Sequence, residues 1–241
     1  MVIFIGFSIS MRLALVAKVC LCNDMWQVVN NFLLTNVRLH IFALMIKEKK
    51  ASRKQEIARR ATELFMQKGY AATSMRDLAN ALGIEAASLY SHIKSKEEIL
   101  RNICFRMADE FFEAMTTVNV QGLTAAEKLK RATVAHLSVI TKDTPASAVF
   151  FHEWRHLSQP YLDEFLQMRT DYEQRFIDII TEGIDSGEFR PIDNKFGMLY
   201  ALSSINWVHH WYKPDGKMSI DEVSNELASL LIAGLKHKNG I

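Results

Sequence analysis

The sequence predicts an all-α protein of about nine helices, in which a three-helix domain precedes a larger helical domain. Proline and glycine are sparse, with 4 and 10 among 241 residues, which favours long helices over a fold with many turns. Serine or threonine repeatedly stands three residues before an acidic residue or glutamine, a pattern that begins helices. Apolar residues then recur at helical spacing, and no alternating strand pattern competes with them.

Capping pairs place the starts of most helices, because each side chain of the pair bonds a free backbone N–H. The pairs are Ser52 with Gln55, Ser74 with Asp77, Ser95 with Glu98, Thr124 with Glu127, and Ser219 with Glu222. Gly69 and Gly83 are expected to end the first two helices. Pro145 is expected to end a linker. Later helices are expected at about residues 147–157, 160–187, 194–212 and 219–240.

Charge is divided unevenly along the chain, although the net charge is only +2. Residues 47–96 hold 11 Lys and Arg against 5 Asp and Glu, whereas residues 97–241 hold 15 against 21. A basic module attracts phosphates and releases their counterions, whereas an acidic module stays away from a polyanion. The distribution favours nucleic-acid binding by residues 47–96, with chance surface charge as the alternative.

Three cysteines, Cys20, Cys22 and Cys104, are too few for a disulfide framework. Their number indicates a reducing compartment and therefore a cytoplasmic protein. Cys20 and Cys22 form one alternating pair without a second, which is a poor zinc signal. Cys104 falls within a helical pattern and is expected to be a small core residue.

Residues 1–44 differ in composition from the rest of the chain, being apolar with few charges. Arg12 and Lys18 interrupt the apolar run, which argues against both a signal peptide and a spanning helix. Met45 precedes a basic stretch from Lys47 that looks like a natural start. We expect residues 1–44 to be an extension that is not native or is disordered, with a membrane-associated segment as the alternative.

Residues 73–100 combine a short helix, a turn containing Gly83 and a second short helix, which is the helix-turn-helix layout. The residues expected to pack the helices together are Leu78, Leu82, Ile84 and Leu89. Ala79 would allow a close approach. Small side chains let a helix enter a major groove, where polar and aromatic groups reach phosphates and base edges. The outer face of the second helix carries Ala86, Ala87, Ser88, Tyr90, Ser91 and His92.

The same stretch resembles the tetracycline-repressor (TetR) family of bacterial regulators. The matching residues are Ala61, Phe65, Gly69, Tyr70, Thr73, Leu78, Ala79, Gly83, Ile84, Leu89, Tyr90, His92, Ile93 and Lys94 to Glu98. The resemblance implies a homodimeric repressor that binds a palindromic double-stranded DNA operator and is released by a small ligand. It also implies a helix-turn-helix domain at residues 45–97 and a ligand-binding and dimerisation domain at residues 98–241.

The resemblance assigns DNA-binding roles to Thr73, Arg76, Ala86, Ala87, Ser88, Tyr90, Ser91, His92 and Lys96. Arg76 is placed to read a guanine edge through two hydrogen bonds, with a phosphate contact alone as the alternative. Tyr90 and His92 fit phosphate contacts, and a core position is the alternative for Tyr90. Lys96 fits a phosphate clamp. Thr73 fits a contact to the DNA backbone.

Two positions depart from the family pattern. Ser91 stands where relatives often carry a larger aromatic residue, which would narrow direct base recognition. Ile93 stands where many relatives carry phenylalanine. This second change is expected to lie in the core.

His152, Glu153 and His156 match the H-E-x-x-H pattern of zinc proteases. Two histidines one helical turn apart could bind zinc, with Glu173 or Glu182 as a third ligand. The pattern is common by chance, and no downstream H-x-x-G-x-x-H follows it. A zinc-dependent hydrolase is therefore the alternative function. We expect a protein that is not an enzyme and that carries neither a metal nor a cofactor.

The C-terminal region is rich in aromatic residues and methionine, which build ordinary cores as well as ligand pockets. Residues 211–216 and the capped apolar helix after them resemble TetR regulators of fatty-acid, sterol or aromatic-acid breakdown, which often sense acyl-CoA thioesters. Arg155, Arg169 and Arg175 are candidate cations for such an effector, with surface salt bridges as the alternative. The expected pocket residues are Phe111, Met115, Phe151, Trp154, Arg155, Met168, Tyr172 and Trp207.

The last two predicted helices have apolar faces that would form a four-helix bundle with a second copy of the chain. The alternative is that these faces pack only inside one chain. The residues concerned are Leu199, Leu202, Ile205, Leu227, Leu230, Leu231 and Leu235. We expect a DNA operator, a second copy and a small effector as partners, and no membrane.

Overall fold

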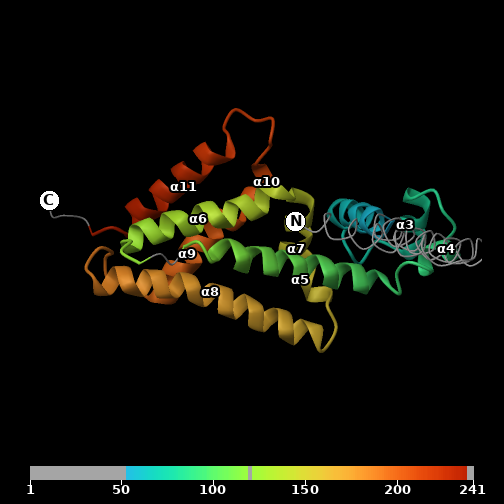
Figure 1. Ribbon diagram of the computed structural model, residues 1–241, viewed down its shortest axis with the longest axis horizontal. Helices are drawn as coiled ribbons and strands as arrows, with labels where there is room; N and C mark the ends of the chain where they lie inside the picture. The colour runs from blue at the N-terminus through green and yellow to red at the C-terminus, as the bar shows by residue number, and fades with distance from the viewer. Residues whose placement is uncertain (1–52, 119–120, 238–241) are drawn as a thin grey trace, which may run out of the picture. The chain divides into compact units, whose positions relative to one another are not determined.

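The computed structural model describes residues 53–118 and 121–237, and most of these residues are helical (Figure 1). The predicted all-α fold is confirmed, since these ranges contain no strand. No helix among the described residues has both the length and the apolar character needed to cross a bilayer. The predicted extension, residues 1–44, and the predicted capping residue Ser52 lie outside the described ranges.

The N-terminal part of the described chain contains three helical segments separated by glycine turns. A helix covers residues 53–68, and Gly69 follows it with a φ of 83°. Helices α3 (Met75–Ala81) and α4 (Ala86–Tyr90) then flank Gly83, which has a φ of 62°. Both glycines adopt the left-handed conformation that other residues rarely take, so the helices end at these points.

The larger part of the chain is built from long helices. Capping boxes at Thr124 and Ser219 form as predicted, and Ser95 accepts a hydrogen bond from the N–H of Glu98. The elements are α5 (Lys96–Met115), α6 (Ala125–Lys142), α7 (Thr144–Glu153), the 3-10 helix η1 (Trp154–His156), α8 (Tyr161–Asp185), α9 (Asn194–Asn206), α10 (Val208–Trp211) and α11 (Ile220–Leu235).

The helix predicted at residues 147–157 begins and ends earlier than expected. Asp143 caps α7 by accepting a hydrogen bond from the N–H of Ala146 at 3.1 Å. Pro145 therefore lies in the first turn, where its missing N–H has no helical partner to lose, instead of ending the linker. After Glu153 the backbone tightens into η1.

The helix predicted at residues 194–212 is interrupted at Trp207. Nδ1 of His209 donates to the carbonyl of Asn206 at 2.6 Å, so a side chain takes the place of a backbone donor. The N–H of His210 bonds the carbonyl of Trp207 instead, at 3.1 Å. The chain therefore continues as the separate short helix α10. The last helix, α11, ends at Leu235 rather than near residue 240.

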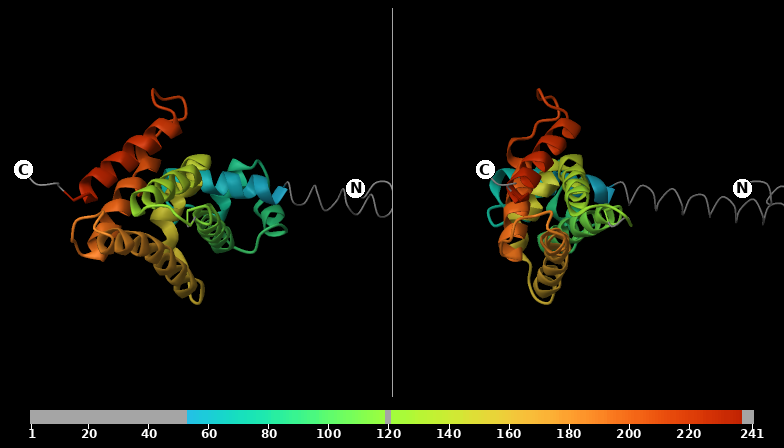
Figure 2. Two further views of the ribbon diagram at one scale, coloured as in Figure 1. Left: turned by 60° about the vertical axis from the view of Figure 1, so that its left-hand side comes forward. Right: turned by 90° about the vertical axis from the view of Figure 1, so that its left-hand side faces the viewer.

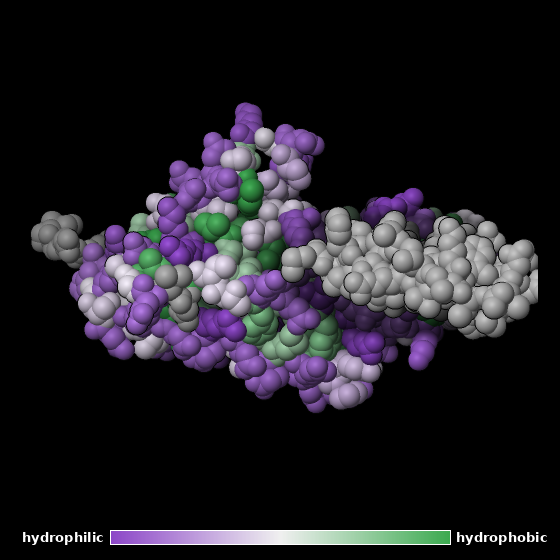
Figure 3. Space-filling view, in the orientation of Figure 1, coloured by the Kyte–Doolittle hydropathy of each residue, from purple (hydrophilic) through white to green (hydrophobic). Residues whose placement is uncertain are grey.

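Helix α6 lies among the other helices of the larger part (Figures 1 and 2), in contact with α5 and with α7 through α11. One continuous apolar core runs from Ile57 in the first helix to Leu235 in the last. Cys104 is buried in this core as predicted, and burial raises the pKa of its thiol to about 12. Figure 3 shows hydrophilic residues over much of the visible face, with apolar residues in patches between them.

Candidate nucleic-acid interface and ligand cavity

Buried apolar side chains hold α3 and α4 together. Leu78 on α3 and Leu89 on α4 are 1% and 0% exposed. The carbonyl of Ala79 accepts the N–H of Ile84 at 3.1 Å, so the turn closes against a small side chain. The predicted packing of the two helices is confirmed.

The remaining side chains of α4 and its neighbours face outward. Tyr90 is 55% exposed, so the alternative interpretation as a core aromatic residue is wrong. Lys94 is exposed as well and borders the same shallow hollow as Tyr90, although its place in the motif had suggested no role. Of the other residues predicted to contact DNA, Arg76, Ala87, Ser88 and Ser91 are exposed, and Ala86 and His92 are half-buried.

Two residues predicted to contact DNA form hydrogen bonds to the protein's own backbone. Thr73 is 2% exposed, and its hydroxyl donates to the carbonyl of Gly69 at 2.8 Å. This buried side chain stabilises the turn and does not belong to the exposed surface around α4. The Lys96 ammonium donates to the carbonyls of Tyr70 and Thr73 at 2.9 and 3.0 Å. Lys96 therefore ties the start of α5 to the loop before α3, and its phosphate contact stays a prediction.

Tyr70 connects this loop to the larger part of the chain. Its ring centroid lies 5.1 Å from that of Phe65 and 5.2 Å from that of His156 in η1. Burial raises the pKa of Tyr70, and the charge of Glu97 raises it further. The Glu97 carboxylate accepts hydrogen bonds from the hydroxyl and N–H of Ser158, which lower its pKa. The region around η1 thus contacts the helix-turn-helix side directly.

A cavity of about 340 Å³ lies between the long helices. Its volume falls within the range of roughly 300–1,000 Å³ that small-molecule sites occupy. Met115 was predicted to line it but borders a separate hollow, because it lies at the end of α5. The other predicted pocket residues all border the cavity: Phe111, Phe151, Trp154, Arg155, Met168, Tyr172 and Trp207.

Two of the three candidate cations border the cavity. The guanidinium groups of Arg155 and Arg169 lie 4.5 and 5.6 Å from the ring centroid of Trp154. Arg169 also pairs with Glu173, with 2.8 Å between Nε and Oε1. Arg175 borders the other hollow instead. The cavity wall therefore combines aromatic surface with positive charge.

Sequence reasoning missed a buried polar network at the cavity. Nδ1 of His136 lies 2.8 Å from the hydroxyl of Tyr172, and its Nε2 lies 2.9 Å from Oδ1 of Asn206. Burial lowers the pKa of His136 to about 3 and raises that of Tyr172. The neutral ring therefore donates from Nε2 and accepts the tyrosine proton at Nδ1. The three residues come from different helices, so no local motif signals them.

The H-E-x-x-H residues do not converge on one point. Helix α7 ends at Glu153, so His152 and His156 do not share a regular helical turn. Nε2 of His156 lies 3.4 Å from the Glu153 carboxylate. Nε2 of His152 instead faces His209 and His210 on α10. This arrangement gives the hydrolase alternative no support.

Helices α9 and α11 present apolar side chains to solvent. Phe196 and Leu199 on α9 are 64% and 45% exposed, and Leu230 on α11 is 63% exposed. The hydroxyl of Tyr200 on α9 donates to the carbonyl of Leu230 on α11 at 3.3 Å, so the two helices adjoin at Leu230. Of the other residues predicted for a dimer interface, Leu202, Ile205, Leu231 and Leu235 are buried within the chain and Leu227 is half-buried.

An outward-facing recognition helix joined to a helical part with an internal cavity defines a helix-turn-helix transcription regulator. Comparison with known families specifies the class further. Residues 57–103 match the model for bacterial regulatory proteins of the tetR family. Residues 122–235 match the model for the C-terminal domain of tetracyclin repressor-like proteins. The chain belongs to the TetR family of transcription regulators.

Individual relatives agree with this assignment. The transcriptional repressor KstR2 of Mycolicibacterium smegmatis is 28% identical over 79% of this chain and 94% of its own length. The fatty acid metabolism regulator protein of Bacillus subtilis is 25% identical over 79% of this chain and all of its own length. The solved structure of PfmR from Thermus thermophilus is 32% identical, with a TM-score of 0.65, covering 75% of this chain and 99% of PfmR.

Membership of this family confirms the predicted function as a DNA-binding transcription regulator. TetR regulators act by binding DNA and are not enzymes, which agrees with the expectation drawn from the sequence.

Acid should destabilise the protein through His136. Its pKa is about 3 in the folded chain but about 6.5 when unfolded. Between these values only the unfolded state binds the proton, so the free energy of unfolding falls as the pH drops from about 6.5 towards 3. Denaturant unfolding at several pH values should show a shallower pH dependence for His136→Gln than for the wild type. Equal pH dependence in both would contradict this account.

Proposed function

We propose that this protein is a cytoplasmic repressor that binds a palindromic operator as a homodimer and releases it when an acyl-CoA thioester enters the cavity. The observation that carries this proposal is the exposed face of α4 on a basic part of the chain whose core continues into the helices around the cavity. Residues 45–97 would bind DNA, and residues 98–241 would bind the effector and the second copy.

The chemistry of the exposed face suits duplex DNA. Small side chains at Ala87 and Ser88 let α4 lie close to the groove, and the exposed Tyr90 hydroxyl suits a phosphate oxygen. Arg76 at the start of α3 can offer two parallel donors to the O6 and N7 of a guanine. Lys94 extends the positive charge beside Tyr90.

The exposed face of α9 and α11 supports a dimer. Large apolar side chains that stay exposed in one chain would be buried against the same face of a second copy. Two recognition helices could then read half-sites about one helical turn of DNA apart.

The cavity supports an effector with an apolar body and an anionic head. Phenylalanine, methionine and tryptophan side chains line it, and Arg155 and Arg169 can attract phosphate or carboxylate groups. A relative named as a regulator of fatty acid metabolism agrees with this chemical class.

The region around η1 supplies a route from the effector to the DNA-binding side. Trp154 and Arg155 border the cavity, while the next residue, His156, stacks on Tyr70. Two residues further on, Ser158 holds Glu97 at the start of α5. A ligand that moves η1 would therefore shift the contacts that position α3 and α4.

Replacing Arg76 should weaken and broaden DNA recognition. Loss of a bidentate base contact costs about 1–3 kcal/mol, so Arg76→Ala should bind roughly 10- to 100-fold more weakly and tolerate a changed guanine. Fluorescence anisotropy measures both effects, with the intergenic DNA upstream of the protein's own gene and with versions of that DNA in which single bases are changed. Arg131→Ala, which removes an equal charge from an exposed position on α6, is the matched control. Equal losses of DNA affinity in the two variants would mean that Arg76 contributes only its positive charge and reads no base.

A charge on the exposed apolar face should break the dimer. Leu230→Asp would place a carboxylate against its own copy, so sedimentation should show monomers and operator affinity should fall at least about tenfold. Leu166→Asp, at another exposed leucine on α8, should stay dimeric. A wild-type protein that is monomeric on its operator would contradict the proposal.

Filling the cavity should weaken the effector response. Met168→Trp would occupy apolar space, so about tenfold more long-chain acyl-CoA should be needed to release the operator, while DNA binding without ligand stays unchanged. Met218→Trp, in an exposed loop, is the control. If no member of a panel of acyl-CoA esters displaces the wild type from DNA, this effector class is wrong.

A further inference from the structure

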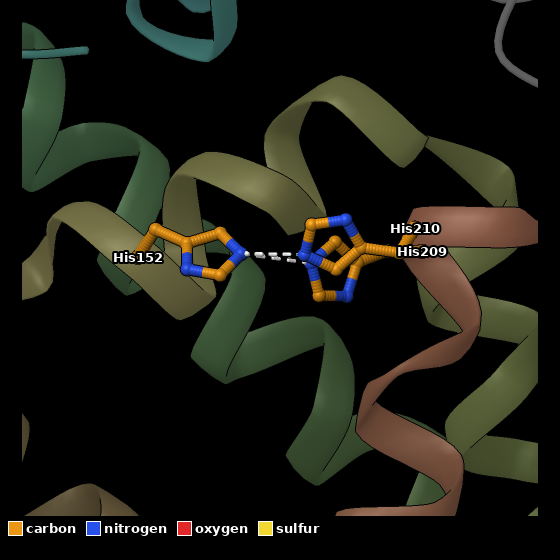
Figure 4. A group of neighbouring side chains, drawn as sticks. All are labelled: His152, His209 and His210. Carbon is orange, nitrogen blue, oxygen red and sulfur yellow. Dashed lines mark hydrogen bonds between the residues drawn. The ribbon is translucent and has the colours of Figure 1, made fainter.

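Three histidine rings from distant parts of the chain meet beside the cavity. His152 comes from the end of α7, and His209 and His210 come from α10 (Figure 4). Nε2 of His152 lies 3.1 Å from Nε2 of His209 and 3.2 Å from Nε2 of His210. Their candidate ligand atoms all lie within 4.8 Å of one another. The Nε2 atoms of three histidines therefore lie close to one another.

Hydrogen bonding alone accounts poorly for this convergence. Nδ1 of His209 donates to the carbonyl of Asn206 at 2.6 Å, so in the neutral ring Nε2 carries a lone pair. A single proton on Nε2 of His152 can serve only one of its two contacts as a straight hydrogen bond. A cation at the meeting point would satisfy all three lone pairs together.

The spacing of the rings fits a transition-metal ion. A zinc ion holds histidine nitrogens at about 2.0–2.1 Å in tetrahedral directions, which places two such nitrogens about 3.3 Å apart. The two separations from His152, 3.1 and 3.2 Å, are close to this value. Imidazole also suits copper and nickel, so the ligand set defines a class of metal rather than one element.

Neighbouring groups hold two of the rings in place. The ring of His209 stacks on Phe151 with centroids 5.1 Å apart, and the Asn206 carbonyl fixes its Nδ1 proton. The ring of His210 lies 3.9 Å from a ring of Trp207. A carbonyl that accepts the second N–H of a metal-binding histidine is a common way to fix its orientation and raise its basicity.

We propose that Nε2 of His152, His209 and His210 bind one divalent transition-metal ion of the zinc class at the edge of the cavity. Three protein ligands leave a fourth position for water or for an oxygen atom of a bound effector. His152 and His209 also line the cavity, so the ion would border the effector. It would also fasten α10 to α7. This differs from the expectation of no metal, and it uses only one histidine of the H-E-x-x-H pattern.

Metal titration of the full chain tests this site. Protein stripped with EDTA is titrated with Co²⁺ and followed by visible absorption, and Zn²⁺ affinity is obtained by competition. Cys20→Ser and Cys22→Ser are introduced throughout, so that their thiols cannot supply ligands. The expected result is one ion per chain with the intense absorption of four-coordinate cobalt, and a higher Tm with Zn²⁺.

Two histidine variants separate this site from the sequence motif. His210→Ala removes an exposed ligand and should weaken Zn²⁺ binding at least about tenfold and abolish the Tm shift. His156→Ala removes the second histidine of the H-E-x-x-H pattern and should leave both unchanged. Absent binding in the wild type, undiminished binding in His210→Ala, or equal loss in His156→Ala would each overturn the proposal. Operator binding in EDTA measures the regulatory function independently.

Discussion

The position of the recognition helix depends on the contacts around Tyr70. The Lys96 ammonium, at the start of α5, bonds the carbonyls of Tyr70 and Thr73 and lies 4.3 Å from the centre of the Tyr70 ring. A half-buried ammonium needs such acceptors, because burying a charge without partners is costly. The loop before α3 is thereby fixed to α5, and the Tyr70–His156 stacking fixes it to η1. The DNA-facing surface and the cavity wall thus share one set of contacts.

Helices α9 and α10 carry residues with several different roles in a short stretch of chain. Their exposed apolar side chains suit a second copy, while Trp207 and His209 border the cavity. Asn206 bonds the buried His136 through its side chain and receives the Nδ1–H of His209 at its carbonyl. The helix break after Asn206 therefore has a local cause, since one carbonyl serves a ring instead of the backbone. The same break turns His209 and His210 towards His152.

Local physics made much of the fold predictable from the sequence. Capping pairs at Ser74, Thr124 and Ser219 mark real helix starts, because the bonds involved span only three residues. The spacing of the residues that match the TetR family also located the recognition helix correctly, because these residues are close together in the sequence. Spacing could not show what each side chain touches, which is why Thr73 was expected on DNA but is buried in its turn. His136 and Asn206, 70 residues apart, gave no signal at all.

The sequence by itself determined the helical architecture, the family and the identity of the outward-facing recognition helix. These features rest on period, capping and motif order, which are properties of neighbouring residues. Only the tertiary structure decided that Lys96 holds a loop, that His152 turns to α10 rather than to His156, and that Leu230 rather than Leu231 stays exposed. Each of these outcomes depends on which distant helix packs against the residue, and the contacts between helices fix that choice.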